Sequence, residues 1–365
     1  MSYSSRGERV SIGVKAKVLY SRLLSPDEYW VLLGSDTVGE IAQKLRATAY
    51  GEALSTLSAD PHRNDIEAVL KNAILHEAAN FAPHLSSPRD KFFRTWVRWH
   101  ESEYLKSVFR YIGAGRMDRD EIRRRFYAIK SSNVSYDNIL SARNFTELSD
   151  NLRGSLYFSP LADSLKRLAS GEEHSLFPLE MALDNFNELS LFKSLKKLEL
   201  EEGDTMLQIF GVRADLYNIY TLYRAMTFYS MTPEEILNRL LPMRYRIKLP
   251  FLREAVRVES FSQTVELLNS EFPAYAELFM GALASDEPQL SLERNIKRYI
   301  YNQAKRVLSS GLPGFHTVMG YFILKEYEIN DIIHITEAVR YGYDRRRAAA
   351  YLIRPIISGG ETEWQ

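Results

Sequence analysis

The feature of this sequence that most constrains its fold is a helical pattern that occurs three times at nearly equal intervals. Its clearest copy is the stretch 206–228, where apolar residues step by three and four positions: Ile209, Val212, Leu216, Ile219, Tyr220, Tyr223 and Met226. This spacing is typical of a helix with one buried face. An acid stands on the same stretch at Asp215, and related stretches place Glu101 before it and Glu328 after it at almost the same interval.

Three further registers agree with this period. A Glu on the edge of an apolar helical stripe recurs at Glu67, Glu180 and Glu293. Good N-cap residues follow the long helices at Asp118, Thr232 and Asp344. Outside this register, Ser25 before Pro26 predicts a further helix start. Apolar positions in an earlier helix recur as the pairs Ala142 and Ala255, Leu148 and Phe261, and Leu152 and Val265. The chain is therefore predicted to contain three copies of one helical unit.

The copies predict the domain boundaries. No segment shows sustained period-two alternation, so the fold class predicted is all-α, with three tandem similar helical domains. The first copy is irregular, because Leu45 stands closer to Leu152 than Leu152 stands to Val265. The expected division is a flexible N-terminal tail over 1–12, helical repeat domains over 13–134, 135–249 and 250–355, and a loose C-terminal tail over 356–365.

Composition excludes several classes of protein. The 47 basic and 47 acidic residues cancel, so no global positive field favours nucleic acid or anionic lipid. Cysteine is absent, which excludes disulfides and thiolate sites. The first residues have no apolar core like that of a signal peptide, and no apolar run approaches the length of a membrane span. These features predict a cytosolic protein.

The sequence lacks the motifs of catalytic, cofactor-binding and metal-binding sites, so no residue is predicted to have any of these roles. The helices around His76 and His100 lack the second His of a zinc-protease helix. A di-iron bundle needs paired Glu-x-x-His motifs, and the nearest candidate is the single pair Asp331 and His334. The turn 311–314 has neither the Lys nor the Ser or Thr of a phosphate-binding loop.

The sequence leaves two interpretations open for each of two sets of charged residues. Glu101, Asp215 and Glu328 either converge at a three-fold centre and titrate together, or each caps a neighbouring helix or pairs with an Arg, which is the commoner case. The third position of their register reads Arg110, Arg224 and Glu337, so its charge differs between the copies. The triplets 123–125 and 345–347 are all arginine and form either solvated faces or a basic patch for an acidic partner.

The chain resembles the C subunits of the bacterial and archaeal A-/V-type ATPases (V-type ATP synthases), whose eukaryotic relative is the d subunit. The resemblance extends from about Gly13 to Pro355. It rests on Ala16-Lys17, the run 47–50, the string from Asp215 to Ala225 and the segment 322–332. Lys17 departs from the family, where Arg is expected after Ala16, and the two tails are somewhat long.

The resemblance implies a non-catalytic central-stalk protein without cofactors. In that family three domains form a pseudo-three-fold funnel. One face sits on the membrane rotor ring at the cytoplasmic side, and the other receives the tip of the central shaft, subunits D and F. Torque passes through the funnel during ATP-coupled proton or sodium transport. The resemblance does not identify the ion, the direction of coupling or the contact residues.

Two other classes remain open from the residues alone. An all-α scaffold of another complex would share the repeats, although the repeats of solenoids are usually much shorter, about 20–50 residues. An all-α enzyme would need a convergent cluster of acids or a metal site. Co-purification with rotary ATPase subunits separates these classes.

Overall fold

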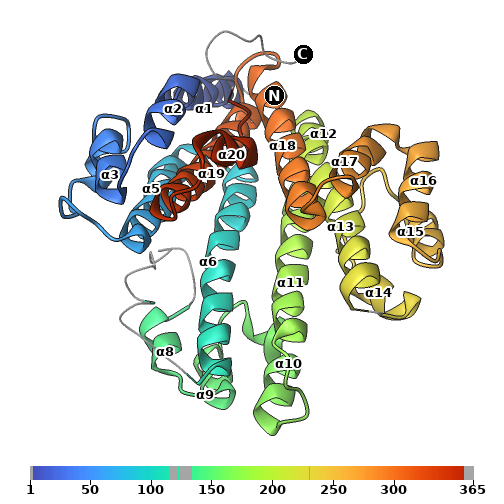
Figure 1. Cartoon of the computed structure of the whole chain (residues 1–365). Coiled ribbons are helices and arrows are strands. Elements are labelled where there is room, and N and C mark those ends of the chain that lie inside the picture. The colour runs from blue at the N-terminus through green and yellow to red at the C-terminus, as the bar shows by residue number, and fades with distance from the viewer. Residues whose placement is uncertain (1–2, 116–121, 123–133, 230, 357–365) are drawn as a thin grey trace. The chain divides into compact units, whose positions relative to one another are not determined.

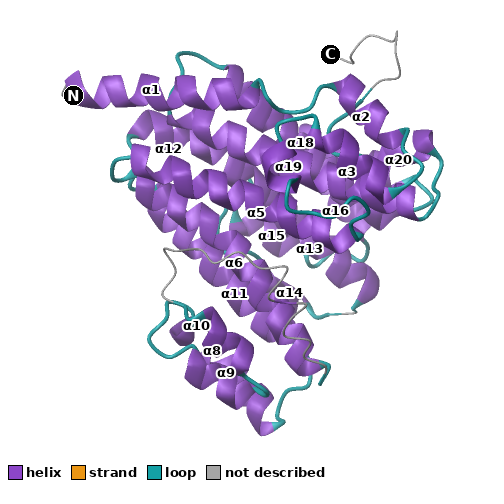
Figure 2. Ribbon diagram, turned by 90° about the vertical axis from the view of Figure 1, so that its left-hand side faces the viewer, coloured by secondary structure: helices purple, strands orange, loops and turns teal. Residues whose placement is uncertain are grey.

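The computed structural model describes residues 3–115, 122, 134–229 and 231–356 of the 365-residue chain, with side chains from residue 7 onward. The described residues form α-helices, one 3-10 turn and one π-helical turn, with no strand among them. The all-α prediction is confirmed. Figure 2 shows helices joined by loops throughout the described residues.

The chain divides into two compact units (Figure 1). Unit 1 comprises Met1–Ile66 and Glu199–Gln365, and unit 2 comprises Glu67–Leu198. Of the helices that the structure describes in unit 2, two belong to the first predicted copy and the rest to the second, because the long helix of the first copy packs on helices that open the second. The helices of unit 2 are α5 (Arg63–Phe81, which begins in unit 1), α6 (Arg89–Gly113), α8 (Tyr136–Ser141), α9 (Phe145–Asn151), α10 (Phe158–Ser170) and α11 (Phe177–Leu195), with a 3-10 turn at Ala82–His84.

Unit 1 holds the remaining helices. Its first part contains α1 (Tyr3–Tyr20), α2 (Pro26–Leu33), α3 (Val38–Arg46) and α4 (Gly51–Leu54). Its second part contains α12 (Leu200–Met206), a π-helical turn (Leu207–Gly211), α13 (Val212–Phe228), α14 (Pro233–Arg239), α15 (Leu249–Ala255), α16 (Phe261–Glu271), α17 (Pro273–Leu283), α18 (Pro288–Ser309), α19 (Phe315–Arg340) and α20 (Arg345–Tyr351).

An antiparallel pair of long helices forms the centre of unit 2. Three side-chain contacts join α6 to α11, and as the residue number rises on α6 it falls on α11 (Figure 1). The contacts are Ser102 with Asn187 at 2.6 Å, Lys106 with Asp184 at 2.6 Å, and Arg110 with Glu180 at 2.8 Å. The apolar residues of α6, including Leu105 and Phe109, are buried in one core with α8 to α11.

In unit 1, α19 lies between the N-terminal helices and α18. The helix α1 packs on α19, and Gly13 lets it approach the turn before α19. A Cβ atom at Gly13 would stand 2.3 Å from the backbone nitrogen of Gly314 and 2.4 Å from the carbonyl carbon of Pro313. Arg9 of α1 forms ion pairs with Glu199 and Glu202 at α12, which lies beside α1 in Figure 2.

Sequence-predicted helix starts are confirmed where the structure describes them. Ser25 and Thr232 each accept a hydrogen bond from the backbone of the Glu three residues later, and that Glu bonds back to the cap backbone. Asp344 accepts from the backbone N–H of Arg347 at 2.9 Å. The predicted cap at Asp118 lies outside the described residues.

The N-terminal segment differs from its prediction. The sequence predicts a flexible tail over 1–12, whereas α1 begins at Tyr3 and ends at Tyr20. Ile12 and Ala16 are buried and Arg9 is held by ion pairs, so tertiary contacts stabilise a segment whose composition suggested a tail. The predicted loose tail over 356–365 lies almost wholly outside the described residues.

Candidate functional site at the buried acids of the long helices

Three helices that stand at equivalent positions in the repeat, α6, α13 and α19, each carry a buried acid. Glu101 of α6 and Asp215 of α13 are 0% exposed, and Glu328 of α19 is 3% exposed. A carboxylate removed from water is costly unless hydrogen-bond donors replace the lost water. All three acids find these donors in other segments of their own unit.

Glu101 is held by two tyrosines. Its Oε1 accepts a hydrogen bond from the hydroxyl of Tyr136, and its Oε2 accepts one of 2.6 Å from the hydroxyl of Tyr157. Burial raises the pKa of Tyr157 well above its usual value, so this phenol remains protonated and donates. Both tyrosines belong to the segment that opens the second copy, so Glu101 ties the long helix of the first copy to the start of the next.

Glu328 has the same relationship with the beginning of the chain. Its Oε1 accepts a 2.7 Å hydrogen bond from the hydroxyl of Tyr50, and its Oε2 accepts one of 2.7 Å from the backbone N–H of Leu24. Tyr50 and Tyr157 are separated by the same interval as Leu45 and Leu152. The last long helix is therefore joined to the first copy in the way that α6 is joined to the second.

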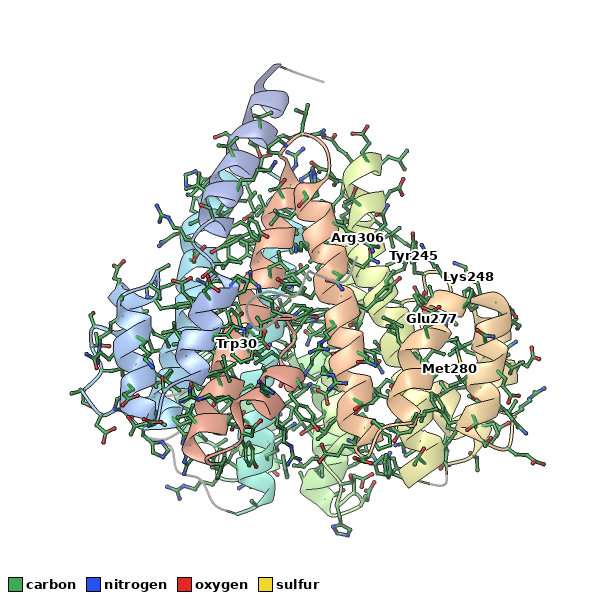
Figure 3. The ribbon with its side chains drawn as sticks, turned by 45° about the horizontal axis from the view of Figure 1, so that its top comes forward. Trp30, Tyr245, Lys248, Glu277, Met280 and Arg306 are labelled. Carbon is green, nitrogen blue, oxygen red and sulfur yellow. The ribbon has the colours of Figure 1, made fainter. Side chains whose placement is uncertain are left out.

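Asp215 uses backbone donors instead. Its carboxylate accepts from the N–H groups of Tyr245, Arg246 and Ile247 at 2.9, 2.6 and 3.1 Å. Figure 3 labels Tyr245 and Lys248 of this loop, which follows α14. The loop lies against the π-helical turn, where a Cβ atom at Gly211 would stand 2.6 Å from the Cβ of Tyr245. Burial raises the pKa of Asp215 despite these three donors.

In α13 and α19, the residue three positions after the buried acid binds the backbone that follows the next short helix. Asn218 accepts a 2.7 Å hydrogen bond from the backbone N–H of Leu241. Asp331 accepts from the backbone N–H groups of Ile353 and Arg354 at 2.7 and 2.9 Å. Asn218 and Asp331 occupy equivalent positions in the repeat register, each three positions after its acid, so the second and third copies share this device.

The two buried acids of α19, Glu328 and Asp331, join three chain segments. Arg354, bound to Asp331 through its backbone, donates from its guanidinium to the carbonyl of Leu24, whose N–H binds Glu328. Burial raises the pKa of Glu328 and raises that of Asp331 to about 7. A half-open pocket of about 220 Å³ lies beside this network and is lined in part by Tyr29, Glu328 and Arg354.

The charged residues at the other repeated positions also form contacts within the fold. Glu67 and Glu293 each bind the Lys one turn later, at 2.5 and 2.7 Å. Arg110 of α6 binds Glu180 of α11 at 2.8 Å, whereas at the third position of the last copy Glu337 binds Arg63 of α5 at 2.7 Å. The polarity of the ion pair is therefore inverted between the first copy and the last.

Asp331 and His334, the nearest candidate pair for a metal site, are not part of a metal-binding cluster in the described residues. Within residues 3–115, 134–229 and 231–356, no group of three or more His, Asp or Glu side chains is arranged to hold a metal ion. Asp331 binds backbone N–H groups, and burial lowers the pKa of its neighbour His334. The arginine triplet 123–125 lies outside the described residues, and the triplet 345–347 forms the exposed first turn of α20.

This arrangement is suited to holding helices together. Each carboxylate is bound by donors that come from a different segment of the chain, so proton transfer to a substrate would first break a contact that stabilises the fold. Sequence reasoning identified the three acids and cited Tyr50 only within the run 47–50 of the resemblance. It missed the bond of Tyr50 to Glu328, and it missed Tyr157 and the loop 245–247 altogether. The interval that Tyr50 and Tyr157 share with Leu45 and Leu152 could have revealed the two tyrosines.

Comparison with known proteins gives one assignment. A family model described as the ATP synthase (C/AC39) subunit matches residues 12–351. A search of curated proteins returns no match. In the part of the chain that the structure describes, every helix is too short or too polar to span a membrane.

Proposed function

The chain belongs to the ATP synthase (C/AC39) subunit family, and from this premise we propose that it is the non-catalytic central-stalk subunit of a V-type or A-type rotary ATPase. In this role it joins the central shaft to the membrane rotor ring and transmits torque for ATP-coupled proton or sodium transport. The family match over residues 12–351 is the observation that carries the proposal.

The contacts within each unit support a role that needs stiffness. A coupler transmits torque only if its helices do not slide past one another under load. In unit 2, α6 and α11 are joined by three polar contacts along their lengths, and in unit 1 the buried acids of α19 bind the N-terminal and C-terminal segments. Buried, hydrogen-bonded carboxylates fix helix positions because any slide leaves a charge without its donors.

The same contacts support a non-catalytic role. Glu101, Asp215 and Glu328 are the buried acids on which the repeats agree, and each is bound by tyrosine hydroxyls or backbone N–H groups of its own chain. We place ATP chemistry and ion translocation in other subunits of the complex. The alternative of an all-α scaffold in an unrelated complex has no comparable observation in its favour.

We further propose three domains, over 13–134, 135–249 and 250–355, arranged as a pseudo-three-fold funnel in the assembled complex. The repeated acids and the two tyrosine contacts support this division, since α6 binds the segment that opens the second copy and α19 binds the first copy. Between the second copy and the third the contact is of another kind, the aromatic pair Tyr223 and Phe261, with ring centroids 5.1 Å apart.

The proposed partners are the shaft subunits D and F on one face and the rotor ring on the other, at the cytoplasmic side of the membrane. The ring is many-fold symmetric, so three repeats cannot pair one to one with its subunits, and a seat defined by shape and polar contacts is expected. Binding through exposed charges weakens with salt, because mobile ions screen them over about 10 Å at 0.1 M.

The test is purification of the tagged, full-length chain from detergent-solubilised membranes of cells that make it. Mass spectrometry is expected to find ring and shaft subunits in fixed proportion to the chain at low salt. A variant with Leu216→Asp, which disrupts the fold, serves as the control and should recover neither. Recovery of the wild-type chain alone, or with an unrelated complex, would contradict the proposal.

A further inference from the structure

Two exposed tyrosines follow the last long helix in an ordered turn. The rings of Tyr341 and Tyr343 are stacked, with centroids 6.0 Å apart, and the residues are 61% and 58% exposed. Gly342 between them has a φ of 65°, and the N–H of Tyr343 donates to the carbonyl of Ala338 at 2.9 Å. The backbone therefore fixes two aromatic rings on the surface of unit 1.

Four arginines flank these rings in the sequence. The guanidinium of Arg340 lies 5.4 Å from the centroid of Tyr341, close enough for a cation–π interaction. The other three, Arg345, Arg346 and Arg347, are exposed in the first turn of α20. We name Arg340, Tyr341, Tyr343, Arg345, Arg346 and Arg347 together the Tyr–Arg cluster.

Local stability accounts for the arginines only in part, since Arg345 donates a 3.1 Å hydrogen bond to the carbonyl of Gly34. The first turn of a helix carries the positive end of the helix dipole, so each cation there is disfavoured by about 0.3–1 kcal/mol. Asp344 offsets part of this cost by capping the helix at Arg347. Of the other acids nearby, Glu337 binds Arg63 at 2.7 Å, and Asp36 lies 4.0 Å from Arg345. The cluster keeps an excess of positive charge.

We propose that the Tyr–Arg cluster binds an acidic polypeptide segment of a partner protein. Tyrosine and arginine supply much of the binding energy at protein interfaces, because they offer a large rigid surface together with hydrogen-bond donors. Guanidinium groups pair with carboxylates through two parallel hydrogen bonds. This inference does not depend on which complex contains the chain.

The surrounding carboxylates favour a polypeptide over a membrane or a nucleic acid. Asp36, Glu337 and Asp344 lie among the arginines, so a continuous negative surface would meet repulsion as well as attraction. A polypeptide presents separate carboxylates that can reach the arginines and avoid the acids. The chain as a whole has a formal net charge of zero, and so offers no long-range attraction to a polyanion.

The corresponding end of α13 provides an internal control. There Phe228 and Tyr229 are 53% and 50% exposed, and Arg224 lies 5.9 Å from the ring centroid of Tyr229. The next helix, α14, has Glu234 and Glu235 in its first turn instead of arginines. The two helix ends thus share the aromatic–arginine contact and differ in the charge beside it.

The test measures binding of a fluorescent poly-glutamate peptide to the full-length chain by anisotropy, at low salt and at physiological salt. The double variant Arg346→Glu/Arg347→Glu places acids where the helix dipole favours them, so α20 remains folded. Its affinity is expected to fall by about 10-fold or more, and that of Tyr341→Ala/Tyr343→Ala likewise.

Two matched controls make the result specific. Arg253→Glu/Arg257→Glu changes the net charge equally at exposed positions on and just after α15, and Tyr229→Ala removes the ring beside the acidic turn. Both should keep wild-type affinity within about 2-fold. No binding by the wild-type chain, equal loss in the arginine controls, or full affinity in the tyrosine double variant would overturn the proposal. Binding to phosphatidylserine vesicles but not to the peptide would also overturn it.

Discussion

The hydroxyl of Tyr50 donates a 2.7 Å hydrogen bond to Oε1 of Glu328, a residue 278 positions later in the chain. The contact joins the first copy of the helical unit to the last long helix. Tyr157 makes the equivalent bond to Glu101, 56 positions earlier. One type of contact therefore joins the first copy to the second and the last copy to the first.

Removing either tyrosine hydroxyl should destabilise its own unit. Tyr50→Phe and Tyr157→Phe each leave a buried carboxylate with one donor fewer, which costs about 1–3 kcal/mol of unfolding free energy. Urea unfolding followed by circular dichroism measures the loss. Tyr343→Phe, at an exposed position, is the control and should change little. Unchanged stability in both buried variants would show that these bonds do not hold the copies together.

The stability of unit 1 should increase as the pH falls from about 8 to about 6. The pKa of Asp331 is raised from 3.8 to about 7, so the folded chain binds a proton in this range that the unfolded chain does not. Folding is then favoured at the lower pH, by about 1 kcal/mol over this range. Burial raises the pKa of Glu328 in the same direction.

The pH effect has a specific control. Asp331→Asn removes the titrating group and should flatten the dependence of the melting temperature on pH, at some cost in stability because an amide accepts with only one oxygen. Asp36→Asn changes an exposed carboxylate and should leave the slope as in the wild type. A wild-type slope in Asp331→Asn would mean that another group titrates.

Leu216→Asp should unfold or loosen unit 1. Leu216 is fully buried on the face of α13 that also holds Ile219 and Tyr223, and an unpaired buried carboxylate costs about 3 kcal/mol or more. Thr227→Asp introduces the same charge at an exposed position of the same helix and serves as the control. Equal melting temperatures for the two variants would show that this face is not a core.

The same substitution at two glycines of α1 should have opposite effects. Gly13→Ala places a Cβ atom 2.3 Å from the backbone of Gly314, so α1 has to move away from the turn, at a cost of about 1–3 kcal/mol. At Gly7 a Cβ atom meets nothing within 4 Å, and Gly7→Ala should stabilise the helix by up to about 1 kcal/mol. Limited proteolysis of α1 measures both effects, and equal digestion of the two variants would contradict the close contact.

Local sequence patterns predicted the helices and their starts. The apolar stripe of α13 and the capping residues Ser25, Thr232 and Asp344 depend on neighbours three or four residues away, which a sequence displays directly. The part of α1 before residue 13 was missed because Arg9 is held by Glu202, a partner that lies far along the chain. Its stability comes from tertiary contacts.

The roles of the acids were predictable in kind but not in detail. The position of Glu101, Asp215 and Glu328 beside an apolar stripe indicated structural contacts, and the structure shows contacts with tyrosines and backbone N–H groups. The loop that binds Asp215 could not be foreseen, because its approach depends on the π-helical turn at Leu207–Gly211 and on the small size of Gly211. The inverted ion pair of Glu337 and Arg63 likewise depends on the packing of α19 against the start of α5.

The most direct test of the proposed function is the coupling between ATP hydrolysis and ion transport in membranes from cells that lack this chain. If the chain is the central-stalk subunit, the catalytic head still hydrolyses ATP while ATP-driven ion transport is lost, and the full-length chain supplied in trans restores transport. Ion transport that remains coupled to hydrolysis in the deletion, or a head and ring that assemble equally well without the chain, would contradict the central-stalk role.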